Sequence, residues 1–358
     1  MIPRNYRRMY DELNTKNEEF EKILFKLKGA DELSTKDILS MDDLSVADIR
    51  LIFRLTMPFK DFIKRSEKKI PLLKGKSTVN FFFETSTRTR VSFELVGKHL
   101  GADTINIGKS DSTMGEKGEI LNDVARTLDS MMTDLIILRH SKAGTPQMIS
   151  KEIKAPVING GDGWHEHPTQ ALLDLYTIYE KKGRIDGQSV VIVGDIMHSR
   201  VAGSLIRGLK KMGANVKVCG PSTLIPYGLD KVFGVKVYHN LDEAIKDVDV
   251  VYALRIQMER AASAFIPTLR EYSKQYIINP ARMKLAKPDA IVMHAGPVNR
   301  DLDIRTEVLE SGQSAVEQQV TNGFALRMAL FYLLIFGDPG KYKKEKLSKE
   351  KQQKLVVK

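Results

Sequence analysis

The chain has 358 residues, 42% of them hydrophobic, which is enough for two domains with sizeable cores. Its formal net charge is +11, but residues 338–358 carry eight lysines against three acidic residues and therefore hold five of those charges. The rest of the chain is only mildly basic. The tail also lacks the interleaved aromatic side chains of a strand-binding groove, so we expect no nucleic-acid partner and interpret it as a solvated flexible end.

Cysteine usage and apolar runs set further limits. Cys219 is the only cysteine, which excludes an internal disulfide and a cysteine-cluster metal site. The longest apolar run, residues 328–336, is nine residues long and too short to span a bilayer. The N-terminal residues are charged and do not form the apolar core of a signal peptide. We therefore expect a cytoplasmic protein with no membrane segment.

The N-terminal part of the chain is typical of accessory and packing segments. Residues 1–40 are highly charged, contain one amphipathic helix pattern, and are interpreted as an accessory extension. Ser45 and Asp48 then predict a capping box, because serine followed three residues later by an acidic residue satisfies the free amides of a helix start. The helix that begins there has an apolar face that includes Ile49 and Phe53. Both segments are expected to serve packing.

A cluster of hydroxyl and guanidinium groups follows directly on an apolar run. Residues 79–83 predict a buried strand, and the apolar spacing from Val91 predicts a helix, so the cluster falls at a strand-to-helix turn. Free backbone N–H groups and the positive end of the helix dipole bind anions at such a turn. No Walker-type pattern is present, so we predict a site for a small phosphorylated molecule. The alternative is an ordinary serine cap followed by surface arginines. The predicted ligands are Ser86, Thr87, Arg88 and Thr89.

Two further basic side chains stand in contrasting positions. Lys117 lies in the polar, glycine-punctuated segment 108–119, which is expected to be exposed; taken alone, it is typical of a solvated surface charge. Arg139 and His140 instead follow a buried strand predicted at residues 135–138. Ligands of open α/β sheets gather at the carboxyl ends of the strands, so Arg139 is a candidate anion ligand.

Segment 159–170 combines glycines with histidines after a short predicted strand. Its glycines allow close backbone approach to a ligand, and His167 and Gln170 are expected at the start of the next helix. His165, Glu166 and His167 alternatively suggest a metal site. A protein metal site needs three or four convergent ligands, and nothing elsewhere in the sequence supplies a convincing one, so we predict no metal.

After a linker at residues 183–187 the alternation of strand and helix begins again. A strand at 189–193, a helix capped by Ser199 and a strand at 216–219 form a βαβ unit, which predicts a second parallel sheet. The unit resembles a dinucleotide-binding fold only weakly, because Gly-x-Gly-x-x-Gly is absent and Arg200 stands where small residues would be needed.

Two later strands and a long helix complete the pattern. The strand predicted at residues 248–254 delivers Arg255 and Gln257, and the strand at 290–293 delivers the turn that begins at His294. Residues 315–336 predict a long apolar-faced helix that is expected to be buried against the first domain.

In this order the motifs are specific as a set, although each alone is weak. The chain resembles the aspartate carbamoyltransferase family, catalytic chain, over roughly residues 40–337. The motifs that carry the resemblance are Ser86-Thr87-Arg88-Thr89-Arg90, Lys117-Gly118-Glu119, Arg139-His140, His167-Pro168-Thr169-Gln170, Arg200, Arg255-Ile256-Gln257-Met258-Glu259-Arg260 and His294-Ala295-Gly296-Pro297-Val298-Asn299-Arg300.

The resemblance implies an α/β fold of two domains, each a mostly parallel sheet flanked by helices. In this division the accessory extension (1–40) precedes a carbamoyl phosphate-binding domain (41–183) and an aspartate-binding domain (184–313). A C-terminal helix (314–337) would return to the first domain, and the basic tail (338–358) would follow it.

The resemblance also implies a role for each motif. The phosphate would be held by Ser86, Thr87, Arg88 and Thr89. The carbamoyl group would contact Arg139, His167, Gln170 and the backbone of Gly296 and Pro297. The two carboxylates of aspartate would be bound by Arg200, Arg255 and Gln257, and fork-shaped guanidinium groups suit a dicarboxylate. Lys117, which is also an implied aspartate ligand, and Thr113 would enter from a neighbouring subunit of a homotrimer. The implied catalytic set is Arg88, Thr89, Lys117, Arg139 and His167.

The implied reaction is attack of the α-amino group of L-aspartate on carbamoyl phosphate, an early step of pyrimidine synthesis that needs no metal or other cofactor. The departing phosphate is the expected proton acceptor, because no side chain of the set is an obvious general base. Ala295 replaces a frequent proline of the family, and we expect a looser turn that displaces the Gly296 carbonyl.

Several alternatives remain open at the level of sequence. Ornithine carbamoyltransferase shares the phosphate turn, but a cationic substrate would meet the Arg255 guanidinium. A catalytically silent scaffold is disfavoured because a donor stands at every ligand position. A regulatory chain, or another enzyme of pyrimidine synthesis, is a possible additional partner.

Overall fold

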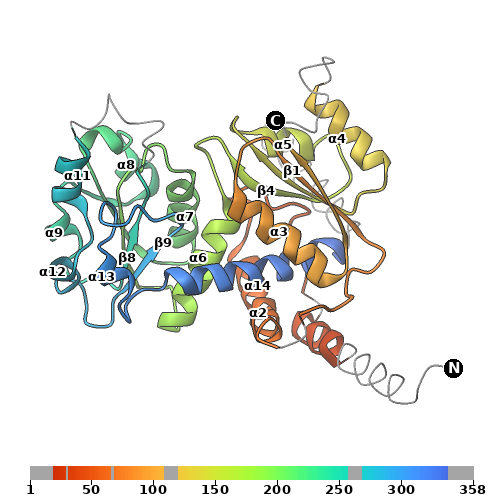
Figure 1. The fold of residues 1–358 in the computed structure, drawn as a ribbon, viewed down its shortest axis with the longest axis horizontal. Coiled ribbons are helices and arrows are strands. Elements are labelled where there is room, and N and C mark those ends of the chain that lie inside the picture. Colours follow the sequence, from red (N-terminus) through yellow and green to blue (C-terminus); the bar gives the residue numbers. More distant parts are fainter. Residues whose placement is uncertain (1–18, 30, 66–67, 109–119, 257–267, 338–358) are drawn as a thin grey trace, which may run out of the picture.

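The computed structural model describes residues 19–29, 31–65, 68–108, 120–256 and 268–337. Figure 1 shows two lobes side by side, each built round a β-sheet with helices packed on it. Both sheets are parallel throughout, which confirms the predicted fold class. Parallel sheets need a crossover after each strand, and the helices that make these crossovers cover the sheets.

The first sheet has the strand order β2-β1-β3-β4. Its apolar core strands continue without alternation because both faces are covered by helices. The strands are β1 (Ser77–Phe82), β2 (Asp103–Gly108), β3 (Leu135–His140) and β4 (Val157–Asp162). The helices of this part of the chain are α2 (Val46–Phe62), α3 (Thr87–Leu100), α4 (Leu121–Ser130), α5 (Thr145–Ser150) and α6 (Pro168–Lys182).

The second sheet has the strand order β7-β6-β5-β8-β9. Its strands are β5 (Ser189–Val193), β6 (Asn215–Cys219), β7 (Lys236–Tyr238), β8 (Val250–Ala253) and β9 (Ile291–His294). The helices are α7 (Arg200–Lys211), α8 (Leu229–Phe233), α9 (Leu241–Ala244), α11 (Leu269–Tyr276), α12 (Pro280–Met283), α13 (Thr306–Leu309) and α14 (Val316–Ile335), with a 3-10 turn at Ser222–Leu224.

Local sequence signals place the helix starts next to the strand ends. The predicted capping box is confirmed, since the Ser45 side chain accepts from the Asp48 amide while the Asp48 side chain accepts from the Ser45 amide. Ser199 likewise caps α7 by accepting from the Ala202 amide. This cap sets Arg200 in the first turn of α7, directly after the loop that leaves β5.

The strand β4 is longer than the sequence predicted. We expected a strand at residues 157–158 followed by a loop, but the strand continues to Asp162 through two glycines. Glycine lowers strand propensity, which explains the short prediction. In the fold, Gly160 and Gly161 are buried at the carboxyl end of the sheet, where side chains from other elements take up the space.

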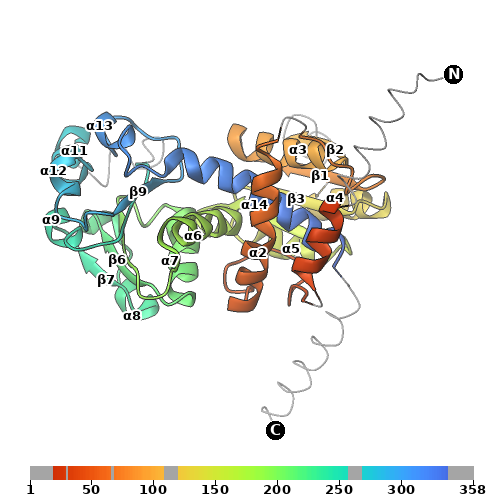
Figure 2. The same ribbon diagram turned by 90° about the horizontal axis from the view of Figure 1, so that it is seen from below.

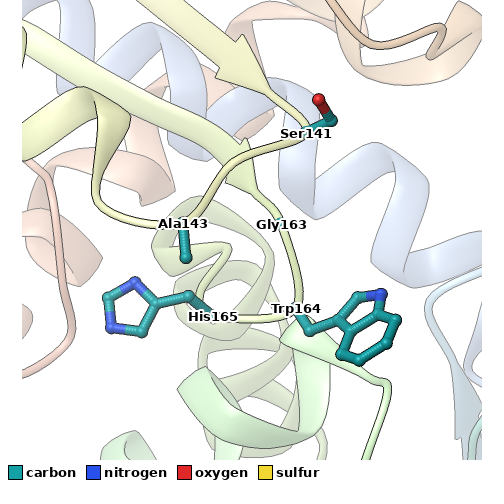
Figure 3. A pocket seen from close by; sticks show the side chains of 5 residues that line it. All are labelled: Ser141, Ala143, Gly163, Trp164 and His165. Atoms are coloured by element: carbon teal, nitrogen blue, oxygen red, sulfur yellow. The ribbon is translucent and has the colours of Figure 1, made fainter.

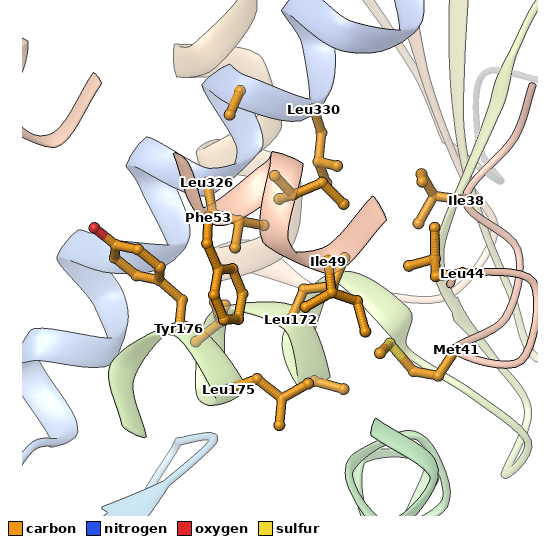
Figure 4. Close-up of a cluster of buried hydrophobic side chains, with 14 of the residues drawn as sticks. Ile38, Met41, Leu44, Ile49, Phe53, Leu172, Leu175, Tyr176, Leu326 and Leu330 are labelled. Carbon is orange, nitrogen blue, oxygen red and sulfur yellow. The ribbon is translucent and has the colours of Figure 1, made fainter. Parts of the chain in front are cut away.

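The helix α14 leaves the second lobe and packs on the first, as predicted. Figure 2 shows it running from β9 toward α2, against which it makes its most extensive contact, and it also contacts α3 and α6. Figure 4 shows the core where these helices meet: Ile49 and Phe53 of α2 face Leu172 of α6 and Leu326 of α14. Burial of these side chains fixes α6, whose first turn carries site residues.

Part of the segment that we assigned to the accessory extension joins this core. Ile38 forms a parallel bridge with Ile158 beside β4, and the Asp37 side chain accepts from the Val157 amide at 2.7 Å. Phe20 and Leu24 are also buried. None of the helices in the described ranges combines the length and apolarity that a membrane crossing needs.

Candidate active site

The carboxyl ends of strands from both sheets bring the predicted polar residues together. The chain leaves β1 toward Glu84, β3 ends with Arg139 and His140, and the loop after β5 leads to Arg200. Open parallel sheets bind ligands at these ends. At these strand ends, side chains link the two sheets. The central residue of this link is Glu84, an acidic residue for which no role was predicted from the sequence.

Glu84 is held between arginines of the two domains. Nη2 of Arg139 donates to Oε1 of Glu84 at 2.9 Å, and Nη2 of Arg200 donates to both carboxylate oxygens at 2.8 Å. Burial raises the pKa of Glu84, but the two guanidinium groups outweigh burial and lower it below its usual range. The carboxylate therefore stays ionised and joins the end of β1 to the start of α7.

Gly161 provides the space in which the two arginines approach each other. A Cβ atom at this position would lie 2.8 Å from Nη1 of Arg139 and 2.8 Å from Nη1 of Arg200, and its φ of +119° disfavours other residues. Nη1 of Arg139 also donates to the Gly160 carbonyl at 2.9 Å, so the glycine strand end orients this guanidinium.

The predicted phosphate turn lies at the start of α3. Ser86 is the N-cap residue, yet its side chain makes no capping hydrogen bond among the described residues. Thr87 and Arg88 are exposed, and Thr89 is buried in the first turn. The alternative interpretation was that Ser86 is an ordinary helix cap, but its hydroxyl does not cap the helix. The backbone N–H groups of the first turn therefore remain available as donors.

Arg88 connects this turn to the second domain. A Cβ atom at Gly296 would lie 3.2 Å from Nη1 of Arg88, so the loop after β9 sits against the guanidinium. Burial and the positive charge of Arg255 lower the pKa of Arg88. Arg255 follows β8, so residues assigned to the phosphate and to aspartate are close enough for their charges to interact.

His167 is buried at the N-cap position of α6, with 5% of its surface exposed. Burial and three nearby guanidinium groups hold its pKa well below the usual range, so the imidazole is neutral at physiological pH. Its backbone amide donates to Oγ of Ser204 on α7 at 2.8 Å, and the Thr169 hydroxyl lies 3.4 Å from Nδ1. With this hydroxyl as the donor, the ring proton is on Nε2.

The loop after β9 is tied down by hydrogen bonds. The Gly296 amide donates to Nδ1 of His294 at 2.7 Å, and Nε2 of His294 lies 3.3 Å from Oδ2 of Asp303. The imidazole proton therefore lies on Nε2, facing the carboxylate. Pro297 follows with an exposed ring. A looser turn at Ala295 stays a prediction.

His165 and Glu166, named in the sequence analysis only as an alternative metal site with His167, bond to other partners. Nδ1 of His165 lies 3.0 Å from Oδ2 of Asp162, while the Glu166 carboxylate accepts from the Met41 amide at 3.0 Å and the Ser204 hydroxyl at 2.8 Å. Among the described residues, no three histidine, cysteine or acidic side chains gather as metal ligands would.

A shallow pocket lies beside the loop that links β4 to His167. Figure 3 shows the side chains of Trp164 and His165 projecting in opposite directions from the chain, with Ala143 on the side of His165. Trp164 packs edge-on against His198, with ring centroids 4.7 Å apart. The pocket contains none of the predicted anion ligands.

Three predicted site residues lie outside the described residues. They are Thr113, Lys117 and Gln257.

The described residues define a class of protein: a two-domain α/β enzyme whose site, made by both domains, gathers guanidinium groups and a neutral imidazole for anionic substrates. Comparison with known proteins gives the family. Residues 36–180 match the carbamoyl phosphate-binding domain of aspartate/ornithine carbamoyltransferases, and residues 186–334 match their aspartate/ornithine-binding domain. The chain belongs to the aspartate/ornithine carbamoyltransferase family.

Individual relatives are similar over nearly their full lengths. The chain is 53% identical over 305 residues to an aspartate carbamoyltransferase catalytic subunit of Moorella thermoacetica, covering 85% of this chain and 99% of the relative. An aspartate transcarbamoylase of Trypanosoma cruzi, solved with carbamoyl phosphate, aligns with a TM-score of 0.74 at 32% identity, covering 83% and 94%. An ornithine carbamoyltransferase of Pyrococcus furiosus aligns at 0.76 and 32%, covering 84% and 97%.

Gly161→Ala should weaken binding of carbamoyl phosphate by about tenfold or more, because the new methyl group would displace the guanidinium groups of Arg139 and Arg200. Backbone strain should add a stability cost of about 1–3 kcal/mol. The KM for carbamoyl phosphate and the thermal unfolding of the variant measure the two effects.

Gly187→Ala is the matched control, since Gly187 also has a positive φ, +73°, but open space around it. It should lose stability and keep its substrate affinity. Unchanged affinity in Gly161→Ala would show that the glycine does not shape the site.

Proposed function

We propose that this protein transfers the carbamoyl group of carbamoyl phosphate to the α-amino group of L-aspartate, giving N-carbamoyl-L-aspartate and phosphate. The observation that carries the proposal is the assembly of Arg88, Arg139, Arg200 and Arg255 from two domains in one site. Such a set suits a phosphate and a dicarboxylate held side by side. The resemblance to the aspartate carbamoyltransferase family further implies that this product enters pyrimidine synthesis.

The choice of aspartate over ornithine rests on residues and not on the fold. An aspartate enzyme and an ornithine enzyme align with this chain almost equally well. Arg255, however, follows β8 at the site and interacts electrostatically with Arg88, so an incoming ammonium side chain would meet positive charge. The 53% identical relative named for aspartate supports the same choice.

We propose the following roles in the reaction. The amino nitrogen of aspartate attacks the carbamoyl carbon, and the carbonyl π electrons move to oxygen to give a tetrahedral intermediate. When this intermediate collapses, the carbon–oxygen bond to phosphate breaks and phosphate leaves with that electron pair. The nitrogen loses a proton, for which the departing phosphate is the proposed acceptor. Ser86, Thr87, Arg88 and Thr89 would bind the phosphate oxygens throughout.

Charge that develops on the carbonyl oxygen would be stabilised by Arg139 and His167. A neutral imidazole with its proton on Nε2 donates a hydrogen bond without adding to the positive charge already present. Preorganised donors of this kind are worth about 3–4 kcal/mol each in transition-state energy. Arg200 and Arg255, with Gln257, would hold the carboxylates and aim the amine at the carbamoyl carbon.

We also propose that the working assembly is a homotrimer in which Lys117 and Thr113 complete a neighbour's site. The surface where that loop begins supports this proposal. Strand β2 forms the edge of the first sheet, ends at Gly108 and leaves Ile105 52% exposed. An apolar sheet edge of this kind favours contact with another subunit.

The cytoplasm is the proposed location. Support comes from the cysteine usage, since Cys219 is the single cysteine of the sequence and is buried. A regulatory chain, or another enzyme of pyrimidine synthesis, is a further proposed partner.

Arg255→Ala should mainly weaken aspartate binding, because this arginine belongs to the second domain. The loss should be about 2–5 kcal/mol in kcat/KM for aspartate, the range for truncating one partner of a buried charge pair. The KM for carbamoyl phosphate should stay nearly unchanged. Arg305→Ala, which removes a surface ion pair of the same domain with Asp301, is the matched control. Equal weakening of both substrates by Arg255→Ala would refute the assignment.

The trimer proposal is tested by mixing inactive subunits. Lys117→Ala and Arg88→Ala homotrimers should each be nearly inactive, because each removes one half of every shared site. Trimers formed from both variants by unfolding and refolding should regain activity wherever an intact Arg88 borders an intact Lys117. Mixed trimers that stay inactive, despite confirmed subunit exchange, would mean that each site lies within one chain.

A further inference from the structure

A buried carboxylate next to the site joins both domains to α14. Asp174 lies on α6, one turn beyond Gln170, and is fully buried. Its Oδ1 accepts from Nε2 of Gln170 at 3.0 Å and from Nε2 of Gln319 at 2.7 Å. Its Oδ2 accepts from the hydroxyl of Tyr252 on β8 at 2.7 Å. We call Asp174, Gln319 and Tyr252 the carboxylate hub.

The hub decides which way the Gln170 amide faces. An amide offers N–H donors on one side and a carbonyl acceptor on the other, and Oδ1 of Asp174 requires a donor. The NH₂ group of Gln170 therefore points to Asp174, which leaves Oε1 of Gln170 on the opposite side. Gln170 is half-buried while Asp174 is fully buried, so this opposite side is the more open one.

The amide of Gln319 is oriented in the same way and links Asp174 to the loop after β9. With its NH₂ group on Asp174, its Oε1 accepts from the His294 amide at 2.9 Å. His294 in turn accepts from the Gly296 amide through Nδ1 at 2.7 Å. A continuous chain of hydrogen bonds thus runs from Asp174 to Gly296, and each member before Gly296 is buried.

We propose that Asp174 and Gln319 are positioning residues that make the site selective for a carbamoyl group. The inference rests on the proposed function, in which Gln170 and Gly296 contact that group. A carbamoyl NH₂ has two N–H donors and needs two acceptors. The hub turns Oε1 of Gln170 toward the substrate and fixes the peptide of Gly296, so that carbonyl oxygens from α6 and from the β9 loop meet the NH₂ together.

A site organised in this way should discriminate between acyl phosphates. A methyl group in place of the NH₂ would leave both carbonyl acceptors facing a group that donates nothing. Sites built to hydrogen-bond a substrate NH reject analogues that lack it, because their own polar groups lose their partners. Acetyl phosphate differs from carbamoyl phosphate by this replacement and is the probe of choice.

The proposed role depends on acceptor geometry and not on charge. Burial raises the pKa of Asp174 to about 7, against the effect of its three donors. When Oδ2 is protonated it can donate to the Tyr252 hydroxyl, and Oδ1 still accepts from both glutamines. An asparagine oriented with Oδ1 toward the glutamines would do the same, whereas a leucine of similar volume would not.

The test uses steady-state kinetics on the full-length protein with three probes. They are carbamoyl phosphate as substrate, and acetyl phosphate and inorganic phosphate as competitive inhibitors. In Asp174→Leu the selectivity, the inhibition constant of acetyl phosphate divided by the KM for carbamoyl phosphate, should fall at least tenfold. The inhibition constant of inorganic phosphate should stay within about threefold, because the α3 turn is untouched. Asp174→Asn should retain the wild-type selectivity within about threefold.

Two variants keep the test decisive. Thr177→Val, one turn further along α6, removes a buried hydrogen bond to Asn322 of α14 and should leave selectivity unchanged. Gln319→Leu keeps Asp174 and cuts the chain to Gly296, so it should lower selectivity even where Asp174→Leu does not fold. Equal selectivity in Gln319→Leu, Asp174→Leu and wild type would overturn the inference.

Gln170→Met separates this inference from the function on which it rests. If Gln170→Met lowers selectivity and the hub variants do not, the carbamoyl assignment stands and the positioning role is wrong. If Gln170→Met itself leaves selectivity unchanged, the contact between Gln170 and the carbamoyl group is wrong.

Discussion

The candidate active site holds like charges together at the junction of the two domains. Arg88 and Arg139 come from the first domain, Arg200 and Arg255 from the second, and Glu84 binds two of these four. Guanidinium groups in a partly buried site repel one another more strongly than they would in water. Glu84 offsets part of this repulsion and ties the domains together. Two anionic substrates would offset the rest, so binding and domain approach would favour each other.

The residues around these charges control the space and the protonation states at the candidate site. Gly161 leaves space for the guanidinium groups of Arg139 and Arg200, which a Cβ atom at this position would contact too closely. Burial and positive neighbours keep His167 neutral, so it donates a hydrogen bond without repelling the arginines. The buried carboxylate of Asp174 is satisfied by three hydrogen-bond donors. The environment of these residues thus sets the properties that the candidate site uses, such as the space at Gly161 and the neutral state of His167.

Much of the fold could be predicted from local sequence patterns. Apolar runs marked the strands of both sheets, and Ser45 and Ser199 marked helix starts, because strand burial and helix capping are decided by neighbours in the sequence. The patterns failed where glycines continue a strand, as at Gly161, and for short edge strands such as β7, whose three residues carry little signal.

The candidate site was predicted as a set of donors, but not its organisation. Glu84 precedes the predicted phosphate turn and was given no role, since nothing local indicates that an acidic residue will meet Arg139 and Arg200, 55 and 116 positions away. Asp174 was hidden in an apolar helix pattern for the same reason. Its partners Tyr252 and Gln319 come from other elements, and pairings over such separations appear only when the chain is folded.

In the proposed function, these charges select carbamoyl phosphate and aspartate. The most direct measurement is an assay of carbamoyl transfer by the purified protein, with L-aspartate and L-ornithine offered side by side at equal concentration. We expect N-carbamoyl-L-aspartate and phosphate in equal amounts, with transfer to ornithine at least a hundredfold slower. Preferential transfer to ornithine, or release of phosphate with neither amine carbamoylated, would contradict it.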